Sequence, residues 1–240
     1  MKPIAFLSRL ILLGMGLPAL ASAESLGSIG ALSQQQFIGF AENLSAATAY
    51  KSIAPAEALG SLGLDIGVEL SSTEIDSTVF DQASDGSFGS SELLVPRLHA
   101  HKGLPFGLDI GASLSAVPDT DISIIGGELR YALIDGGVVT PALAVRASYS
   151  QLQGITDFDL NNSALELTVS KGFLVLTPYA GAGLVRSVAD PHAIANLNKE
   201  TFEQKKFYVG LAVSLGFALT LEIDRTGDYR TYSAKAGIRF

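Results

Sequence analysis

The sequence predicts an all-β fold, an antiparallel transmembrane β-barrel of about ten strands with a short N-terminal amphipathic helix. Apolar and polar residues alternate over many segments, which is the period of a strand with two different faces. The 240-residue chain is 48% hydrophobic with a mean hydropathy of +0.34, yet this hydrophobicity is dispersed in alternating form. No long apolar run follows the amino terminus, so any insertion into a membrane must use strands.

The amino terminus has the order of a secretory signal peptide. Lys2 and Arg9 are followed by an apolar run over residues 10–17, then by Pro18 and Ala21-Ser22-Ala23. This pattern predicts cleavage after Ala23. The alternative, a retained anchor, is disfavoured because the run is shorter than the roughly 20 residues that span a bilayer. We therefore expect a signal peptide at 1–23, a periplasmic segment at 24–60 and a barrel at 61–240.

The composition excludes several classes of function. The chain has no Cys, which excludes a lipoprotein anchor, a disulfide framework and thiol chemistry. Without the two basic residues of the signal, 14 Lys and Arg stand against 24 Asp and Glu, a formal charge of −10. A surface of this charge repels nucleic acid, so no nucleic-acid partner is expected.

Residues 34–47 are predicted to form an amphipathic helix. Ser33 and Gln36 match a capping box, and Phe37, Phe40 and Leu44 recur at helical spacing. The helix could plug the barrel, cover its periplasmic mouth or bind a partner. The favoured interpretation is that it packs its apolar stripe against the barrel base.

The first strand begins near Leu62 and sets the two environments of the wall. Its apolar residues alternate with a face that carries Asp65 and Glu69. A charge facing lipid at the midplane costs ~2–4 kcal/mol for a base and less for an acid, so the charged face is expected to point inward. The same alternation predicts nine further strands at 91–101, 105–117, 122–134, 139–152, 162–171, 174–187, 203–215, 218–225 and 229–240.

Two of these strands are the least regular. Pro96 lies inside 91–101 and lacks a ladder donor, and the lipid-facing side of 174–187 cannot be assigned. Eight strands would result if Pro96 removed one strand and a neighbour. Twelve would result if the segment before Leu62 were extended.

The closing strand resembles the terminal strand of bacterial outer-membrane β-barrels. Tyr232, Ile238 and Phe240 lie on its apolar face, and the chain ends on the aromatic. In that class the barrel-assembly machinery recognises alternating apolar residues that end on an aromatic. The resemblance therefore implies an outer-membrane location, assembly through these three residues, and contact with outer-membrane lipid and lipopolysaccharide. Residues 50–69 also resemble an uncharacterised proteobacterial outer-membrane family, through Tyr50-Lys51, Pro55-Ala56-Glu57, Leu59-Gly60 and 65–69.

The predicted connections alternate in length. Short turns follow the second, fourth, sixth and eighth strands, including a tight hairpin at 135–137, while roughly 15 polar residues follow the first and seventh. Short turns are typical of the periplasmic end, so both termini are expected there.

The inward face is expected to line the lumen with charge: Asp65, Glu69, Arg97, Asp109, Glu128, Arg130, Arg146, Glu166, Glu222, Lys235 and Arg239. Such charges must be paired or hydrated. A salt-bridged network that fills the lumen is favoured over a narrow polar channel.

Few residues suggest chemistry. His99 and His101 share one strand face and could ligate a metal with Asp109, but two partly hydrated histidines near the periplasmic rim are the favoured interpretation. His192 follows Asp190, and its nearest serine is Ser187, which is weak support for a hydrolase. No catalytic residue, metal or cofactor is expected.

The leading hypothesis is a small non-enzymatic outer-membrane barrel, structural or passively transporting small solutes through a narrow polar lumen. The alternative is a ligand-binding or adhesive barrel that acts through acidic external loops around Asp76, Asp81, Asp85, Asp119, Asp121, Asp157 and Asp159. A lipid-modifying enzyme is the third hypothesis.

Overall fold

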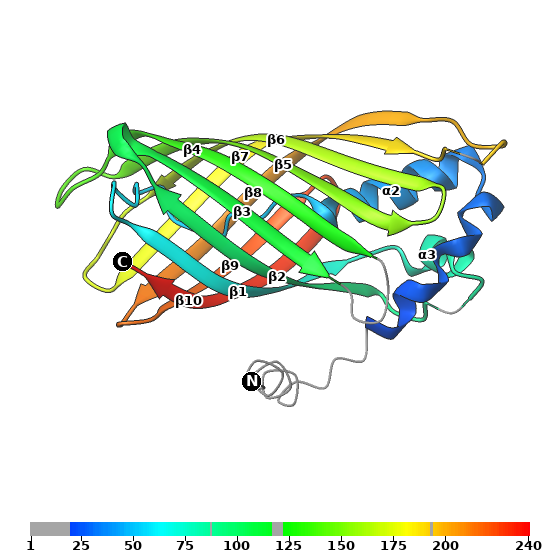
Figure 1. Ribbon diagram of the computed structural model, residues 1–240, viewed down its shortest axis with the longest axis horizontal. Coiled ribbons are helices and arrows are strands. Elements are labelled where there is room, and N and C mark those ends of the chain that lie inside the picture. Colours follow the sequence, from blue (N-terminus) through cyan, green and yellow to red (C-terminus); the bar gives the residue numbers. More distant parts are fainter. Residues whose placement is uncertain (1–19, 87, 117–121, 193) are drawn as a thin grey trace, which may run out of the picture.

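The computed structural model describes residues 20–86, 88–116, 122–192 and 194–240, with side chains from residue 26 onward. Most of the predicted signal peptide lies outside these residues. Ten strands form one closed antiparallel barrel, in which each strand pairs with the next along the chain and β1 pairs with β10 (Figure 1). The predicted fold class and strand number are therefore confirmed.

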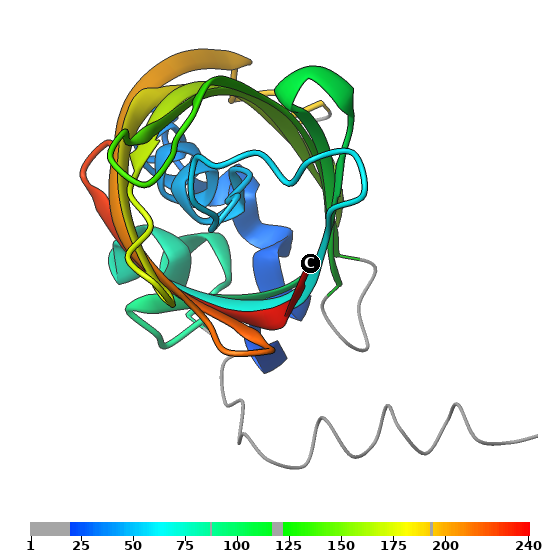
Figure 2. The ribbon, with the colours of Figure 1, turned by 90° about the vertical axis from the view of Figure 1, so that its left-hand side faces the viewer.

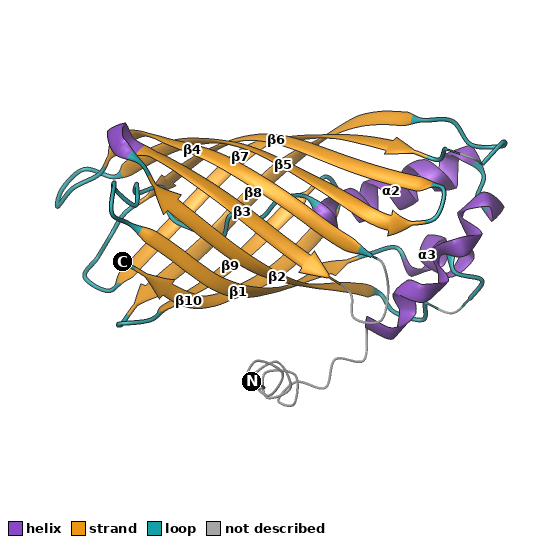
Figure 3. Ribbon diagram, viewed as in Figure 1, coloured by secondary structure: helices purple, strands orange, loops and turns teal. Residues whose placement is uncertain are grey.

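The wall is formed by β1 (Leu64–Glu74), β2 (Glu92–Gly103), β3 (Leu108–Ala116), β4 (Ser123–Asp135), β5 (Ala142–Ile155), β6 (Phe158–Ser170), β7 (Leu176–Asp190), β8 (Glu200–Ser214), β9 (Ala218–Thr226) and β10 (Tyr229–Arg239). The helices are η1 (Leu20–Ala31), α2 (Gln34–Thr48), α3 (Ser77–Ala83) and the single turn η2 (Pro105–Gly107). Figure 3 shows η1 and α3 at the end of the barrel opposite the carboxyl terminus. None of the described helices is long and apolar enough to cross a membrane.

The barrel is apolar outside and polar inside. In β9 buried and exposed residues alternate without interruption. The buried residues of β9 include Thr220 and Glu222. On other strands the exposed residues include Leu165 of β6, 61% exposed, and Val209 of β8, 58% exposed. This is the reverse of a soluble protein, in which such a number of exposed large apolar side chains would favour aggregation. A bilayer around the wall accounts for the pattern, because lipid solvates the outward face and backbone groups pair within the closed sheet.

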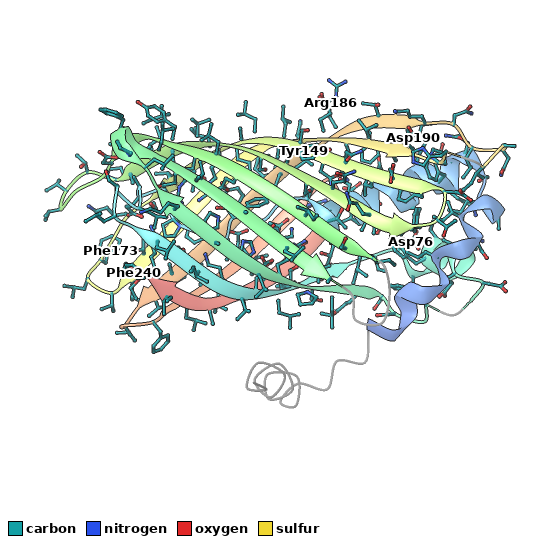
Figure 4. The ribbon with its side chains drawn as sticks, viewed as in Figure 1. Asp76, Tyr149, Phe173, Arg186, Asp190 and Phe240 are labelled. Carbon is teal, nitrogen blue, oxygen red and sulfur yellow. The ribbon has the colours of Figure 1, made fainter. Side chains whose placement is uncertain are left out.

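Four exposed phenylalanines lie at the end of the barrel where the chain finishes. They lie in the short connections and at the carboxyl terminus: Phe106, Phe173, Phe217 and Phe240, between 55% and 91% exposed. Figure 4 shows Phe173 and Phe240 close to this end. Aromatic side chains form such girdles where a barrel wall meets the membrane interface.

Several boundaries differ from the sequence prediction because of proline and of positive backbone angles. β3 begins at Leu108 instead of residue 105, since Pro105 opens the turn η2 and Phe106 has a φ of 66°. The predicted tight hairpin at 135–137 is wrong. The connection spans residues 136–141, with Pro141 immediately before β5, so the strand starts later than its apolar residues suggest.

Pro96 does not interrupt β2, but it lies where the pairing on one side ends. On the β1 side the ladder continues past it to Glu92, with Pro96 opposite Leu70. On the β3 side the described pairing stops at Leu98 and Leu114. A proline has no N–H to donate, so it fits where one side of the strand has no ladder partner.

The strand whose faces could not be assigned, β7, packs through tyrosines over glycines. Tyr179 of β7 lies opposite Gly210 of β8, and Tyr208 of β8 lies opposite Gly181 of β7. A Cβ at Gly210 would come within 2.2 Å of the Tyr179 ring. The inward residues of β7 therefore include Tyr179, and its outward residues include Leu184, 51% exposed.

The N-terminal segment runs through the barrel. α2 lies inside the ring of strands when the barrel is viewed along its axis (Figure 2). It begins near α3, and the chain then crosses the interior to the opposite end, where β1 starts beside the carboxyl terminus. The expectation that the helix packs against the barrel base is therefore wrong. Both termini were expected at one end, but α2 begins at the end opposite the carboxyl terminus, and only the start of β1 lies beside that terminus.

Candidate functional site in the occupied barrel interior

The start of α2 closes one end of the barrel with apolar packing. Ser33 and Gln36 form the predicted capping box, which fixes the first turn of the helix. Phe40 then packs on Phe80 of α3, with ring centroids 4.9 Å apart, and Phe37 meets Phe158 of β6 at 5.9 Å. All four rings are fully or almost fully buried. The helix and the long connection after β1 therefore share one apolar cluster.

The second half of α2 and the chain after it are enclosed by the wall. Every residue from 43 to 56 is buried. Ser45 and Ser187 of β7 hydrogen-bond at 2.6 Å, and the Asn162 side chain of β6 donates to the Thr48 hydroxyl at 3.2 Å. Polar residues of the helix thus meet polar residues of the wall, as buried hydrogen-bonding groups require.

Lys51 connects the segment to the wall by charge. Its Nζ lies 2.7 Å from Asp224 Oδ2 of β9, and both side chains are fully buried. A similar buried pair within the wall joins Lys206 of β8 to Glu166 of β6, also at 2.7 Å. Water does not reach these buried charges, so each charge depends on its partner for compensation.

The carboxyl end of α2 is held by an arginine from the wall. Arg97 of β2 donates to Glu69 Oε1 at 2.8 Å and to the Ala47 carbonyl of the helix. The last carbonyls of a helix have no partner inside it and carry partial negative charge, so a cation there is favourable. Glu69 also accepts a hydrogen bond from His99. This Glu69 cluster joins β1, β2 and α2.

After the helix ends, arginine side chains of the wall donate hydrogen bonds to backbone carbonyls of the N-terminal segment. Arg130 of β4 donates to the Pro55 carbonyl at 2.8 Å, and Arg146 of β5 donates to the Ala54 carbonyl. Buried carbonyls outside a helix or sheet need such partners. Arg130 also pairs with Asp109 at 2.6 Å, so its charge is compensated as well.

The segment leaves the barrel through further contacts with the wall. The Leu59 amide donates to Asp109 Oδ1 at 3.1 Å, and the Ala56 amide donates to the Ser170 hydroxyl at 2.9 Å. Arg239 donates to the Glu57 carbonyl at 3.2 Å. The wall therefore binds the segment along its whole path.

The eleven residues expected to face inward all lie on the interior face. Ten are buried, and Arg239 is partly exposed at the rim. They surround the N-terminal segment together with two further buried charged residues of the wall, Lys206 and Asp224, and the segment contributes the buried Lys51. Tyr232, Ile238 and Phe240 lie outside, at 44%, 50% and 69% exposure.

The expected environment of the paired histidines is wrong. His99 and His101 are each only 2% exposed, because the N-terminal segment covers them. His101 Nε2 lies 3.0 Å from the Tyr50 hydroxyl, and Asp109, the proposed third ligand, pairs with Arg130. Among the described residues, no group of three His, Asp or Glu side chains is placed to hold a metal ion.

His192 lies in the connection between β7 and β8 and has carboxylate partners. Its Nε2 is 2.6 Å from Asp159 Oδ2, and its Nδ1 is 3.5 Å from Asp190 Oδ1. Ser187 is fully buried and donates a hydrogen bond to Asn162, so it is not placed as a nucleophile beside His192. In Figure 4 Asp190 lies near the same end of the barrel as Asp76.

These features define a transmembrane β-barrel whose interior is occupied by its own N-terminal segment. No protein-family model matches the chain, and no curated protein sequence matches it. Solved barrels match about three quarters of this chain and nearly their own full length. The N-terminal barrel of Pseudomonas aeruginosa OprF is 13% identical with a TM-score of 0.39, over 73% of this chain and 97% of that one. The KdgM porin is 10% identical with a TM-score of 0.36, over 75% and 99%. Omp33 of Acinetobacter baumannii is 10% identical with a TM-score of 0.31, over 75% and 100%. Similarity at this level identifies no family and no activity.

Proposed function

We propose that the protein is a structural, non-conducting barrel of the bacterial outer membrane that holds its N-terminal segment through the bilayer. The observation that carries this proposal is the continuous burial of residues 43–56 inside the wall. The outward apolar face and the phenylalanine girdle support a membrane location, and a barrel in a bacterium spans the outer membrane.

The occupied interior argues against passive transport. A solute passing along the axis would have to displace a chain bonded by Arg97, Arg130 and Arg146 from three different strands. Each displaced carbonyl would lose a charge-assisted hydrogen bond, and each arginine would be left buried without its acceptor.

A vesicle experiment tests this directly. Vesicles that contain refolded residues 24–240 are expected to show no swelling in small sugars and no stepwise ion conductance in planar bilayers. Insertion is verified by flotation of the same vesicles. A variant without residues 34–58 that still folds should conduct, which controls for the detection limit. Discrete currents through the unaltered protein would contradict the proposal.

Binding through acidic loops receives less support, because several of the described carboxylates have internal partners. Asp76 accepts from the Thr78 amide at the start of α3, and Asp81 accepts from the Gly89 amide. Asp159 pairs with His192, and Asp190 pairs with Lys199 at 2.8 Å. Asp119 and Asp121 lie outside the described residues.

We also infer that Tyr232, Ile238 and Phe240 form a signal for the barrel-assembly machinery. Their exposure supports this, since a partner can reach them only on the outward face. Replacing Phe240 by Ser is expected to lower the amount of barrel in isolated outer membranes several-fold, while stability after refolding in detergent changes by no more than about 0.5 kcal/mol. Phe217→Ser is the matched control, because Phe217 is 55% exposed at the same end. An equal loss in both variants would show that general membrane anchoring, and no signal, is responsible.

A further inference from the structure

An apolar cavity of about 60 Å³ lies beneath the wall at the end where α2 enters. None of the residues that line it carries a charge. They come from η1, α2, α3, the connections before β2 and β4, and strands β2 to β5: Leu26, Leu44, Thr48, Phe80, Phe88, Leu93, Leu94, Val95, Pro96, Ser115, Ile122, Ser123, Ile124, Leu152 and Ile155. Introducing an ion or a strongly polar solute would cost its hydration without a compensating charge.

The cavity meets the wall where the β2–β3 ladder ends. Described pairing stops at Leu98 and Leu114, two residues before β3 ends at Ala116. Residues of the cavity lining lie on both sides of this interruption, on β2 at Leu94 and Pro96 and on β3 at Ser115. Pro96 contributes directly, since it has no N–H with which to close the ladder.

The interruption lies within the apolar outer band. Leu98, Leu114 and Ile125 are 58%, 49% and 50% exposed on the strands around it. In a membrane these side chains contact lipid hydrocarbon, so the material next to the end of the described ladder is acyl chain. The cavity has less than half the volume of the roughly 150 Å³ engineered cavity that binds benzene. It therefore matches a chain end and excludes a ring or a headgroup.

We propose that the interruption between β2 and β3 admits the end of one acyl chain of a membrane phospholipid into this cavity. The chain end moves from bilayer hydrocarbon into an apolar cavity, so it loses no hydration, and dispersion contacts with the lining hold it there. The chain would touch α2 through Leu44 and α3 through Phe80, which links the bound lipid to the interior segment.

The chain has no Trp, so a single introduced Trp reports on contact with brominated lipid. Phe88→Trp places the indole in the cavity lining. In vesicles of phosphatidylcholine brominated on its acyl chains, its fluorescence is expected to fall at least twofold relative to vesicles of the unbrominated lipid. Phe37→Trp is the matched control, because Phe37 is equally enclosed but does not line the cavity, and little quenching is expected there. Leu129→Trp on the outward face gives the upper limit.

Filling the cavity tests the position of the chain. Adding Ile124→Phe to Phe88→Trp should remove the quenching, whereas it should leave Leu129→Trp unchanged. If Phe88→Trp does not show heat-modifiable migration, Phe80→Trp replaces it, since Phe80 lines the same cavity. The proposal is overturned if the cavity indole is quenched no more than Phe37→Trp, or if quenching persists after the cavity is filled.

Discussion

Replacing Lys51 by Met is expected to destabilise the folded barrel by about 3–5 kcal/mol, because removing one member of a buried ion pair leaves an uncompensated charge. Lys51 Nζ lies 2.7 Å from Asp224 Oδ2, and neither side chain is accessible to solvent. The Thr226 hydroxyl also donates to Asp224, but a neutral donor cannot replace the cation. The free energy of unfolding in urea, measured for protein refolded in detergent, gives the loss.

The double variant Lys51→Met/Asp224→Asn is the matched control. Replacing both members of a buried pair is often close to neutral, so the double variant is expected to recover most of the stability lost in Lys51→Met. If the double variant instead loses the sum of the two single effects, the two residues are not coupled and the ion pair does not hold the segment.

Replacing Glu69 by Gln is expected to cost a similar amount, about 3–5 kcal/mol, by leaving the Arg97 guanidinium buried without a carboxylate. Arg97 would keep its bonds to Ser71 and to the Ala47 carbonyl, which are neutral acceptors. His99 would also lose its anionic partner. Urea unfolding of the variant, followed by circular dichroism, measures the change.

An exposed acid on the same strand separates burial from charge. Glu74 of β1 lies 3.9 Å from Arg230, and both side chains are 52% exposed. Such pairs contribute little, so Glu74→Gln is expected to change stability by no more than about 0.5 kcal/mol. Equal losses in the Glu69 and Glu74 variants would mean that net charge, and not the buried cluster, determines stability.

Alternation predicted the number of strands and the faces of most of them, although it left the faces of β7 unassigned and began β3 and β5 too early. Lipid on one side and a polar interior on the other constrain every second residue, so Asp65, Arg146 and Glu222 could each be assigned a face without knowledge of their partners. Asp224 alternates in phase with Glu222 on β9, and Lys206 with the buried positions of β8, so the same alternation assigns both to the inward face.

The path of the N-terminal segment could not be predicted in the same way. Residues 49–63 form no helix or strand, so they show no period that reports a buried face. The wall holds them largely through their backbone, as at the carbonyls of Ala54 and Pro55. Any residue offers a carbonyl, and these contacts therefore leave no signature in the sequence. For this reason the burial of His99 and His101 was not predicted, since Tyr50 of this segment covers them.

The threaded segment also makes the molecule a single cooperative unit. Its partners are spread over the whole circumference, with Arg97 on β2, Arg146 on β5, Ser187 on β7 and Asp224 on β9. These contacts are complete only when β1 has joined β10, and opening that seam would expose the charges they bury. Local fluctuations that in an empty barrel would involve one strand pair must here disturb the interior as well. The seam between first and last strand is thus stabilised from within, by residues that belong to neither strand.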